Sequence, residues 1–349
     1  MPPPPNNQTA AITNGPMSSS VAPRSRRKWL EVSVALLIWL VALTLILANR
    51  QSLSDWWRLR DYNPPASVSR LATQDTMDGY ARHLFYLNRP QLLPTVTSFR
   101  KFCPENENTI VLGCYHLGQN GIFIYNVSDP TLAGVQQVTA AHEVLHAVYA
   151  RLSTKGRNYV DGLLENYYQH DLHDPRVQAE IKLYQQTEPH DVMDEMHSTF
   201  GTEIANLPAP LEAYYKRFFT NRSAIVAYEQ LYEGEFTSRQ NTMAQDDQQL
   251  ANMKQQISAQ ETSLGTALNQ INADQGRLNS LLSSEQTVAY NAAIPDYNSE
   301  VDAYNNGVDS LRSAITAYNQ LVAARNLVAG QLTTLDNALD TRLPTQATR

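Results

Sequence analysis

The stretch that decides the fold of this chain is QQVTAAHEVLHAVYARL, residues 136–152. Its apolar positions recur at helical spacing, and Gly134 and Gly156 stand on either side of it, so the pattern predicts a helix. The residues next to its central polar positions are uncharged, with Thr139–Ala141 before them and Ala147–Val148 after them. A helix in solvent would carry charges there, so we expect this one to be buried beneath a cleft.

The central residues of this helix, His142-Glu143-Val144-Leu145-His146, form an HExxH motif. Side chains four residues apart lie on one helix face, so both imidazoles reach one metal ion and Glu143 projects beside the open coordination position. Zinc is the ion that imidazole and carboxylate ligands with one open position hold most often. The motif therefore predicts a zinc site with His142 and His146 as ligands and Glu143 as the general base that takes a proton from the activated water.

The flanked motif TAAHEVLHAV, residues 139–148, resembles that of the zincin metallopeptidases. The resemblance covers about residues 62–235, is specific at the motif and is loose elsewhere. It implies an α+β catalytic domain, mostly helical with a small antiparallel sheet, that hydrolyses internal peptide bonds. It also implies an edge strand that binds extended substrate, and Ile122–Val127 is the candidate for that strand.

The third zinc ligand is expected on a later helix. A metzincin would continue with Gly and a third His, which residues 147–152 lack, so the resemblance favours a gluzincin-like arrangement. In that arrangement a glutamate several tens of residues further on completes the site. Glu195 is the preferred ligand, and Glu203 and His197 are the alternatives.

Other polar residues near the predicted site have less definite roles. Ser198 and Thr199 are expected to support a ligand from behind. A donor for the oxyanion of the transition state is expected too, and the sequence does not rank the candidates. These candidates are Tyr149, His190, His197, Tyr214 and Tyr215. The segment HDLHD at residues 170–174 also holds ligand types, but its polar surroundings predict a solvated loop and not a second metal site.

A second feature of the chain is the apolar run WLEVSVALLIWLVALTLILA, residues 29–48, whose single charge is Glu31. At about 1.5 Å per residue it nearly spans a hydrocarbon core of about 30 Å. Leu45–Ala48 lack the small residue that precedes the cut of a signal peptide, so we expect an uncleaved transmembrane signal anchor. Residues 1–28, with prolines at Pro2–Pro5 and no acidic residue, are typical of a disordered tail.

The basic residues around this run predict its orientation. Those close to its N-terminal end are Arg24, Arg26, Arg27 and Lys28, and those spread beyond the other end are Arg50, Arg58 and Arg60. By the positive-inside rule the tail is cytoplasmic. The catalytic domain, after a juxtamembrane linker at residues 49–61, is then extracytoplasmic, and the composition fits a bacterial cell envelope.

Ahead of the central helix, the β-rich runs Thr109–Leu112 and Gly121–Val127 predict an antiparallel hairpin with a turn at residues 118–121. Cys103 and Cys114 flank the first run, close enough for a disulfide outside the cytoplasm. The alternative is that both cysteines are buried and unpaired. Further helices are expected at residues 76–87, 158–169, 175–186, 192–206 and 211–232.

From Phe236 onwards the composition shifts to Gln, Asn, Ser, Ala and Leu. Apolar residues recur every seven positions, at Phe236, Met243, Leu250, Ile257, Leu264, Ile271 and Leu278. Pro295 predicts a turn at residues 290–296, after which a second apolar frame begins at Val301. We therefore expect an antiparallel coiled-coil hairpin at residues 236–340 and a tail at 341–349. The alternatives are a dimerising coiled coil and a partly ordered segment.

The chain as a whole has 27 Lys and Arg against 34 Asp and Glu, a formal net charge of -7, which argues against binding to nucleic acid. The combined hypothesis is a membrane-anchored zinc metallopeptidase acting on a protein or peptide substrate, with the coiled coil available for a partner or for self-association. One alternative is a cell-envelope structural protein whose zinc site is structural or idle, and another is a cell-wall remodelling factor. The presence of Glu143 favours the enzyme, because a structural site needs no base.

Overall fold

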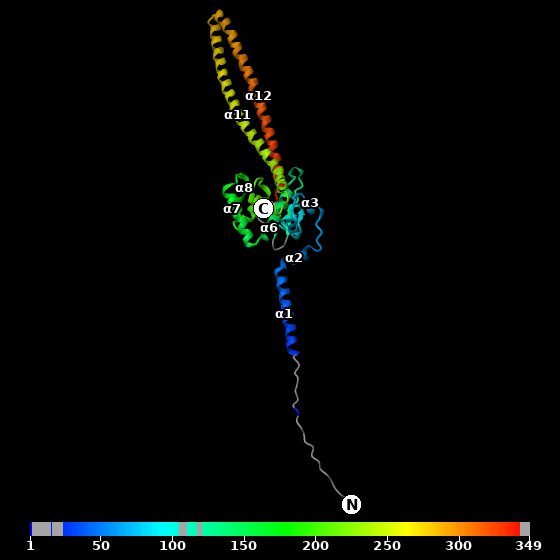
Figure 1. Cartoon of the computed structure of the whole chain (residues 1–349). Coiled ribbons are helices and arrows are strands. Elements are labelled where there is room, and N and C mark those ends of the chain that lie inside the picture. Colours follow the sequence, from blue (N-terminus) through cyan, green and yellow to red (C-terminus); the bar gives the residue numbers. More distant parts are fainter. Residues whose placement is uncertain (2–14, 16–23, 105–109, 117–120, 343–349) are drawn as a thin grey trace. The chain divides into compact units, whose positions relative to one another are not determined.

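The computed structural model describes residues 1, 15, 24–104, 110–116 and 121–342. It divides into two compact units, Met1–Asp61 and Tyr62–Arg349. Most of the described chain is helical, with one small sheet (Figure 1). The predicted disordered tail before residue 24, the predicted turn before residue 121 and the predicted tail after residue 342 lie outside the described residues, apart from Met1 and Gly15.

The first unit contains the helices α1 (Arg24–Ala48) and α2 (Arg50–Leu59). Within the described part of the chain, Lys28–Ala48 is the one helix long and apolar enough to cross a membrane, as its composition predicts. Helix α1 begins at Arg24, so the last residues of the segment predicted to be disordered are helical. Helix α2 occupies most of the predicted linker.

The sheet of the second unit has three strands, β1 (Gln91–Leu93), β2 (Gly113–His116) and β3 (Gly121–Tyr125), in the order β1-β3-β2. The antiparallel pairing of β2 with β3 confirms the predicted hairpin. The prediction of a purely antiparallel sheet is wrong, because β1 pairs parallel with β3. Since β3 is therefore central, Ile122–Val127 is not the edge strand, and β2 has that place instead.

The first strand of the hairpin also lies later in the sequence than predicted. Residues 110–112 have no regular structure, and the strand begins at Gly113. The apolar run at Thr109–Leu112 has good β-propensity, but the packing of the strand against the central helix decides the register. Gly113 lies where a side chain would meet Thr139 and Glu143 of that helix, and only a residue without a side chain fits there.

The predicted central helix is α6 (Val135–Ala150). It packs against β2 and β3, against α3 (Ala66–Gln74) and α4 (Gly79–Leu87), and against α9 (Val192–Glu203) and α11 (Arg222–Ser283). Val144, Leu145 and Val148 are fully buried. Each such side chain contributes about 1.5–3 kcal/mol when it leaves water, so burial on several sides holds α6 in place.

The remaining helices of this unit are α5 (Val96–Arg100), the 3₁₀ helix η1 (Pro130–Leu132), α7 (Thr154–His170), α8 (Pro175–Thr187) and α10 (Ala209–Tyr215). The predicted helix 192–206 ends at Glu203. The predicted helix 211–232 is interrupted, because α10 ends at Tyr215 and α11 starts at Arg222. A β-bridge between Phe219 and Met77 and hydrogen bonds between Asn221 and Thr76 take this segment out of helical geometry.

Helices α11 and α12 (Thr287–Leu339) lie side by side and run in opposite directions (Figure 1). Arg325 pairs with Asp247 at 2.9 Å, and Gly307 lies against Leu264 nearer the turn. The residues of the first apolar frame are all buried or half-buried, from Phe236 to Leu278. The face of α11 that packs against α12 is therefore the face that carries the apolar residues spaced seven apart.

The turn between the two long helices is not where the sequence predicts it. It lies at residues 284–286, where Glu285 has φ 56°, and Pro295 is inside α12. Proline is a strong signal for a break because it lacks an N–H and clashes with the preceding turn. Here the Pro295 side is exposed, so the helix accommodates the proline at its surface.

The far end of α12 returns to the globular part of the unit. Leu335 and Leu339 pack with Val127, Leu132 and Val135 in one hydrophobic cluster. Thr341 is fully buried beyond them, which corrects the prediction that the tail begins at residue 341. Its carbonyl accepts a hydrogen bond from Arg100 Nε at 2.7 Å, and its hydroxyl donates to the Val111 carbonyl at 2.6 Å.

Cys103 and Cys114 form a disulfide with a Cα–Cα distance of 6.0 Å, which confirms the predicted pairing. It joins the loop after α5 to the first residues of β2. Phe99 and Phe123 pack around it in a small hydrophobic cluster. The disulfide thus fixes the N-terminal end of β2, the strand that packs against α6.

Candidate metal centre

Helices α6 and α9 bring together His142, His146 and Glu195. The Nε2 atom of His142 lies 3.5 Å from Glu195 Oε2, and that of His146 lies 3.6 Å from Glu195 Oε1. One ligand atom from each of the three residues lies within 4.8 Å of the others. Two ligands of a tetrahedral zinc ion, each about 2.0–2.1 Å from the metal, are separated by about 3.4 Å. The two imidazole-to-carboxylate distances, each to a different oxygen of Glu195, are close to that spacing.

The close approach of α9 to α6 places Glu195. Gly201 of α9 makes this approach possible, because a Cβ at this position would come within 2.5 Å of Leu145 Cδ1 and 2.7 Å of the Tyr215 ring. Helix α9 is buried along its second half, from Met196 to Thr202. Its first turn carries Asp194 and Glu195 out of this buried contact and towards the imidazoles of α6.

Asp194 supports the site in a way that the sequence analysis did not predict. Its Oδ1 lies 2.9 Å from His146 Nδ1, so His146 presents its other nitrogen, Nε2, to Glu195. Ser198 and Thr199, predicted for this role, are buried elsewhere on α9 with side-chain hydroxyls that have no hydrogen-bond partner among the described residues. The consecutive pair Asp194-Glu195 was the available signal, since it puts a second carboxylate beside the ligand.

The charges of the site favour a cation. Burial opposes charge on His146, but the carboxylates of Glu195 and Asp194 outweigh it and raise the pKa of His146 to about 10. Burial likewise opposes charge on His142, and Glu195 nevertheless raises the pKa of His142. Burial raises the pKa of Glu195, but His146, His142 and a hydrogen bond from Tyr184 bring that pKa below its ordinary value. The carboxylates thus stabilise positive charge on the two imidazoles, and the imidazoles in turn stabilise negative charge on Glu195.

Glu143 lies beside this group with its side chain buried. Burial raises the pKa of Glu143 to about 7, because desolvation of the carboxylate outweighs the attraction of His146 and His142. Its Oε2 atom has no hydrogen-bond partner among the described residues. Gly113 of β2 lies directly against the carboxylate. The Glu143 side chain is thus a buried carboxylate with one oxygen that accepts no hydrogen bond from the described residues and a pKa near neutrality.

Comparison with family models, with curated proteins and with solved structures found no match. The inference about a possible ligand therefore depends on the side chains of the site. Two imidazoles and one carboxylate, with the remaining side open to a cavity, are the ligand types and the number typical of catalytic zinc. The hydrogen bond from His146 to Asp194 is the kind of support that fixes a ligating imidazole.

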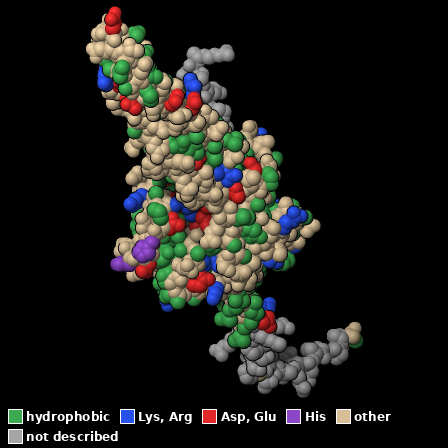
Figure 2. Space-filling model, turned by 90° about the horizontal axis from the view of Figure 1, so that it is seen from above, with side chains coloured by type: hydrophobic (Ala, Val, Ile, Leu, Met, Phe, Trp, Pro, Cys, Tyr) green, Lys and Arg blue, Asp and Glu red, His purple; other side chains and the backbone are tan. Residues whose placement is uncertain are grey.

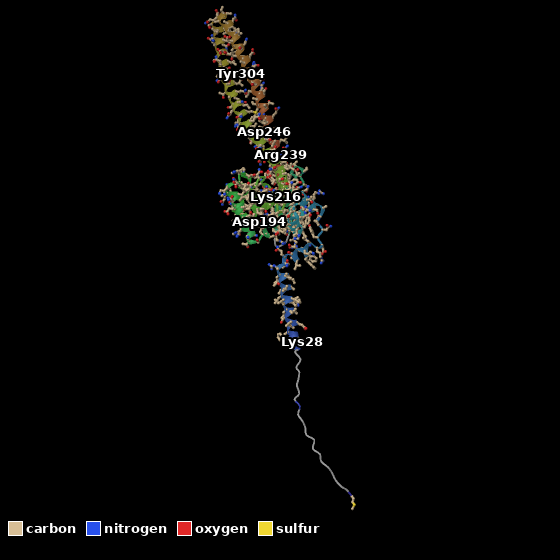
Figure 3. All side chains as sticks on the ribbon, viewed as in Figure 1. Lys28, Asp194, Lys216, Arg239, Asp246 and Tyr304 are labelled. Atoms are coloured by element: carbon tan, nitrogen blue, oxygen red, sulfur yellow. A yellow bond between two sulfur atoms is a disulfide. The ribbon has the colours of Figure 1, made fainter. Side chains whose placement is uncertain are left out.

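A cavity of about 440 Å³ opens onto these residues. Its lining includes His142, Glu143 and His146 of α6 together with residues of α8 and of the start of α9. Residues 110–115, which include most of β2, form a further part of the lining. Figure 3 shows Asp194 in the globular part of the unit, whereas Asp246 and Tyr304 are on the long helices. The site thus lies in the globular part and not in the hairpin.

Acidic side chains are unusually concentrated around this cavity. Besides the site itself they are Glu180, Glu188, Asp191 and Glu203. On the face of the molecule in Figure 2, by contrast, acidic and basic side chains are interspersed. The one basic side chain among the cavity-lining residues, apart from histidine, is Arg176.

The structure does not bring the two alternative third ligands into the group. Glu203 lines the cavity, but its carboxylate lies 2.7 Å from Arg176 Nη1, and Arg176 also contacts Glu229 at 2.8 Å. His197 is fully buried on another side of α9, with Nε2 2.9 Å from the Tyr214 hydroxyl. Burial, followed by the charges of His146 and His142, lowers the pKa of His197 to about 3.

None of the predicted oxyanion donors lines the cavity. The Tyr149 hydroxyl donates to Asp161, Tyr214 pairs with His197, and the Tyr215 hydroxyl donates to the His197 carbonyl. The tyrosines that do line the cavity are Tyr115, Tyr184 and Tyr232. They come from β2, α8 and α11, and only the folded arrangement brings them together.

The segment at residues 170–174 lies apart from the site. His170 and His173 are exposed, and His170 Nδ1 pairs with the backbone carbonyl of Asn166 in its own helix. Within the described part of the chain these residues are not among the groups that converge on one point. The carboxylate of Asp174 instead caps the first turn of α8.

Proposed function

We propose that this chain is a zinc-dependent metallopeptidase, anchored in a membrane by α1, whose folded unit hydrolyses peptide bonds on the extracytoplasmic side. The observation that supports it most is the convergence of His142, His146 and Glu195 beside the buried Glu143, at the wall of an open cavity. A site that only stabilised the fold would need neither the buried carboxylate nor the opening.

In this proposal the residues of the chain divide the work between them. His142, His146 and Glu195 hold the ion, and Asp194 keeps the His146 ring in the orientation that presents Nε2. Zinc, when bound, supplies a Lewis acid that lowers the pKa of water and polarises a carbonyl group. Glu143 accepts a proton and passes it to the leaving amine, for which a pKa near neutrality is well matched.

The substrate in this proposal is an extended peptide that lies along β2. Among the described residues this strand pairs with β3 on one side only, and its residues Gly113–Tyr115 line the cavity. An exposed strand edge binds extended peptides through main-chain hydrogen bonds. We propose that Tyr115 and Tyr184 contact the carbonyl oxygen of the substrate. Both line the cavity. Tyr115 belongs to β2, and the Tyr184 side chain forms a hydrogen bond with Glu195.

The finer description of the fold belongs to the same proposal. We regard residues 62–235 as a zincin-like domain, since its central helix carries the HExxH motif and a small sheet lies beside it. We regard α11 and α12 as an antiparallel coiled coil, since the residues of the seven-residue frame from Phe236 to Leu278 are buried or half-buried. The hairpin then offers a long polar surface to a protein partner or to a second copy.

The test is the substitution Glu143→Gln in the full chain purified in detergent. We expect it to keep about one zinc per chain and to lower peptidase activity about 10²–10⁴-fold, since Gln fills the same space without accepting a proton. Metal analysis and cleavage of a casein or peptide-library substrate measure the two effects. Glu165→Gln, an exposed change on α7, is the control and should alter neither.

The wild-type chain also decides against the alternative functions. Zinc without cleavage of any protein or stem-peptide substrate would favour a structural role for the site. Cleavage of stem peptides alone would favour cell-wall remodelling. Loss of zinc in Glu143→Gln would show that the carboxylate holds the metal and is not a base.

A further inference from the structure

Helix α2 carries an exposed apolar surface that the proposed function does not use. Leu53, Trp56 and Trp57 are 49%, 59% and 65% exposed. Isolated apolar side chains at a surface are common, but two adjacent exposed tryptophans are not, because each ring gains about 1.5–3 kcal/mol or more on burial. Nothing in the described part of the first unit covers this pair.

The position of α2 next to α1 indicates the partner of this pair. The break between the helices is confined to Asn49, and hydrogen bonds cross it on both sides. The Asn49 N–H donates to the Leu45 carbonyl at 3.0 Å, and the Leu53 N–H donates to the Asn49 carbonyl at 3.0 Å. Helix α2 therefore continues the membrane-spanning candidate Lys28–Ala48 with little interruption.

The spacing of the tryptophans along these helices matches a bilayer. Trp29 stands at the first turns of α1, and the distance along the helices from Trp29 to Trp56 is about 40 Å at about 1.5 Å per residue. A bilayer with its headgroup layers is about 40–45 Å thick. If Trp29 lies at one interface, Trp56 and Trp57 therefore lie within the headgroup layer of the other.

The residues beside the pair fit that environment. Tryptophan is enriched at both membrane interfaces, where its ring is partly in the apolar region and its N–H meets polar groups. The Arg60 guanidinium lies 4.6 Å from the centre of the Trp57 ring and pairs with the exposed Asp61 at 3.2 Å, and Arg50 is exposed one residue after Asn49. Guanidinium groups at this depth are well placed for lipid phosphates.

We infer that α2 is an interfacial helix whose Trp56 and Trp57 lie among the lipid headgroups at the end of α1 that leads into the folded unit. The inference rests on α1 crossing a bilayer, which is part of the proposed function, and it holds for either orientation. The partner is a lipid headgroup layer. The two rings then set the depth at which the chain leaves the membrane, a few residues before the folded unit begins at Tyr62.

The sequence makes this inference open to a direct fluorescence test, because the chain's 4 tryptophans are Trp29, Trp39, Trp56 and Trp57. The full-length double variant Trp29→Phe/Trp39→Phe therefore emits from α2 alone. It is reconstituted in vesicles of phosphatidylcholine with one quarter phosphatidylglycerol. The quenchers are a nitroxide on the lipid headgroup, a nitroxide deep in the acyl chain, and acrylamide in the water.

We expect the headgroup nitroxide to quench this variant more strongly than the deep nitroxide, and acrylamide to quench it several-fold less than free N-acetyltryptophanamide. Full quenching by acrylamide with no response to either lipid label would place α2 in water, or against protein, and would overturn the inference. Stronger quenching by the deep label would overturn it as well, because α2 would then lie in the hydrocarbon core.

The matched variant Trp56→Phe/Trp57→Phe distinguishes failure of the inference from failure of its premise. Its emission comes from Trp29 and Trp39, and the deep nitroxide should quench Trp39, which stands midway along α1. If both variants ignore both lipid labels, α1 does not cross the bilayer and the anchoring and the interfacial role fall together. If only the α2 signal ignores them, the anchor stands and the interfacial role falls.

Discussion

Individual residues determine which carboxylate joins the two imidazoles in the candidate metal centre. Glu195 and Glu203 are on the same helix and both line the cavity. They differ in their partners, because Glu195 faces the two imidazoles and Glu203 is paired with Arg176. The sequence alone does not predict which of the two glutamates faces the imidazoles. The difference arises because α8 places Arg176 next to Glu203.

The first prediction at this scale concerns the third ligand. Glu195→Gln should weaken zinc binding by more than about 100-fold, since loss of a supporting residue alone costs about 10–100-fold. Glu203→Gln, the same change two turns further along α9, should keep the zinc. Metal analysis after dialysis against a weak chelator compares the two. Retention of zinc in Glu195→Gln together with its loss in Glu203→Gln would reverse the assignment.

A second prediction concerns Gly113. In Gly113→Ala the new Cβ would meet the Glu143 carboxylate and Cγ, the latter at 2.8 Å, so Glu143 has to move. Displacement of a catalytic group by about 1 Å costs about 100-fold in rate, and we expect a loss of that order with zinc retained. The control is Gly162→Ala on α7, where nothing lies within 4 Å of the new atom. Equal activity of the two variants would contradict the role of Gly113.

Much of the site was predictable at this scale, for a definite reason. His142, Glu143 and His146 are in one helix, and helical geometry alone fixes their relation. Asp194 and the cavity tyrosines were missed because their roles depend on α9, α8 and β2 meeting α6. Gly113 was missed for the same reason, since a glycine before a cysteine carries no signal until its neighbour across the fold is known.

Secondary structure elements follow the sequence where local signals are strong and depart from it where distant contacts decide. The central helix and the apolar helix α1 lie where periodicity and length predict them. Strand β1 has only 3 residues and is held by its pairing with β3, which no local pattern shows. The interruption between α10 and α11 likewise comes from Met77, far away in the sequence.

The turn of the long hairpin gives the prediction at this scale. Since Pro295 lies inside α12, Pro295→Ala should restore a main-chain donor and raise the stability of the hairpin, by up to about 3 kcal/mol. Circular dichroism at the helical band and the thermal midpoint measure the gain. Ser299→Ala, an exposed change one turn on, should have a small effect. A loss of stability in Pro295→Ala would indicate that the chain turns at the proline after all.

The second unit contains contacts between residues that lie far apart in the sequence. Arg100 and Val111 are bonded to Thr341, more than half the length of the chain away, and Val111 lines the cavity. Tyr232, on the first turns of α11, lines the same cavity. Both long helices are therefore attached to the walls of the site, one where it leaves the globular part and the other where it returns.

The prediction at this scale compares two shortened chains that stop at different residues. A chain that stops at Asp340 should be less stable than one that stops at Arg342 by about 1–3 kcal/mol, because it loses the buried Thr341 with its two hydrogen bonds and also the surface pair of Arg342 with Asp340. Thermal unfolding of both proteins in the same detergent measures the difference. Identical thermal midpoints would mean that the contact of Thr341 with Val111 does not stabilise the folded unit.

The attachment of Thr341 to Val111 also sets an order of events during synthesis. A ribosome releases α6 and α9 long before it reaches the last turn of α12. The two imidazoles and Glu195 therefore emerge before Thr341 can form its hydrogen bond with Val111 in the wall of the cleft. Domains ordinarily fold as units while the chain grows, N-terminal parts first. In this protein the growing chain must form both long helices and bring the second one back before the cleft is complete, so newly made chains acquire the finished cleft of the candidate site only when translation is essentially over.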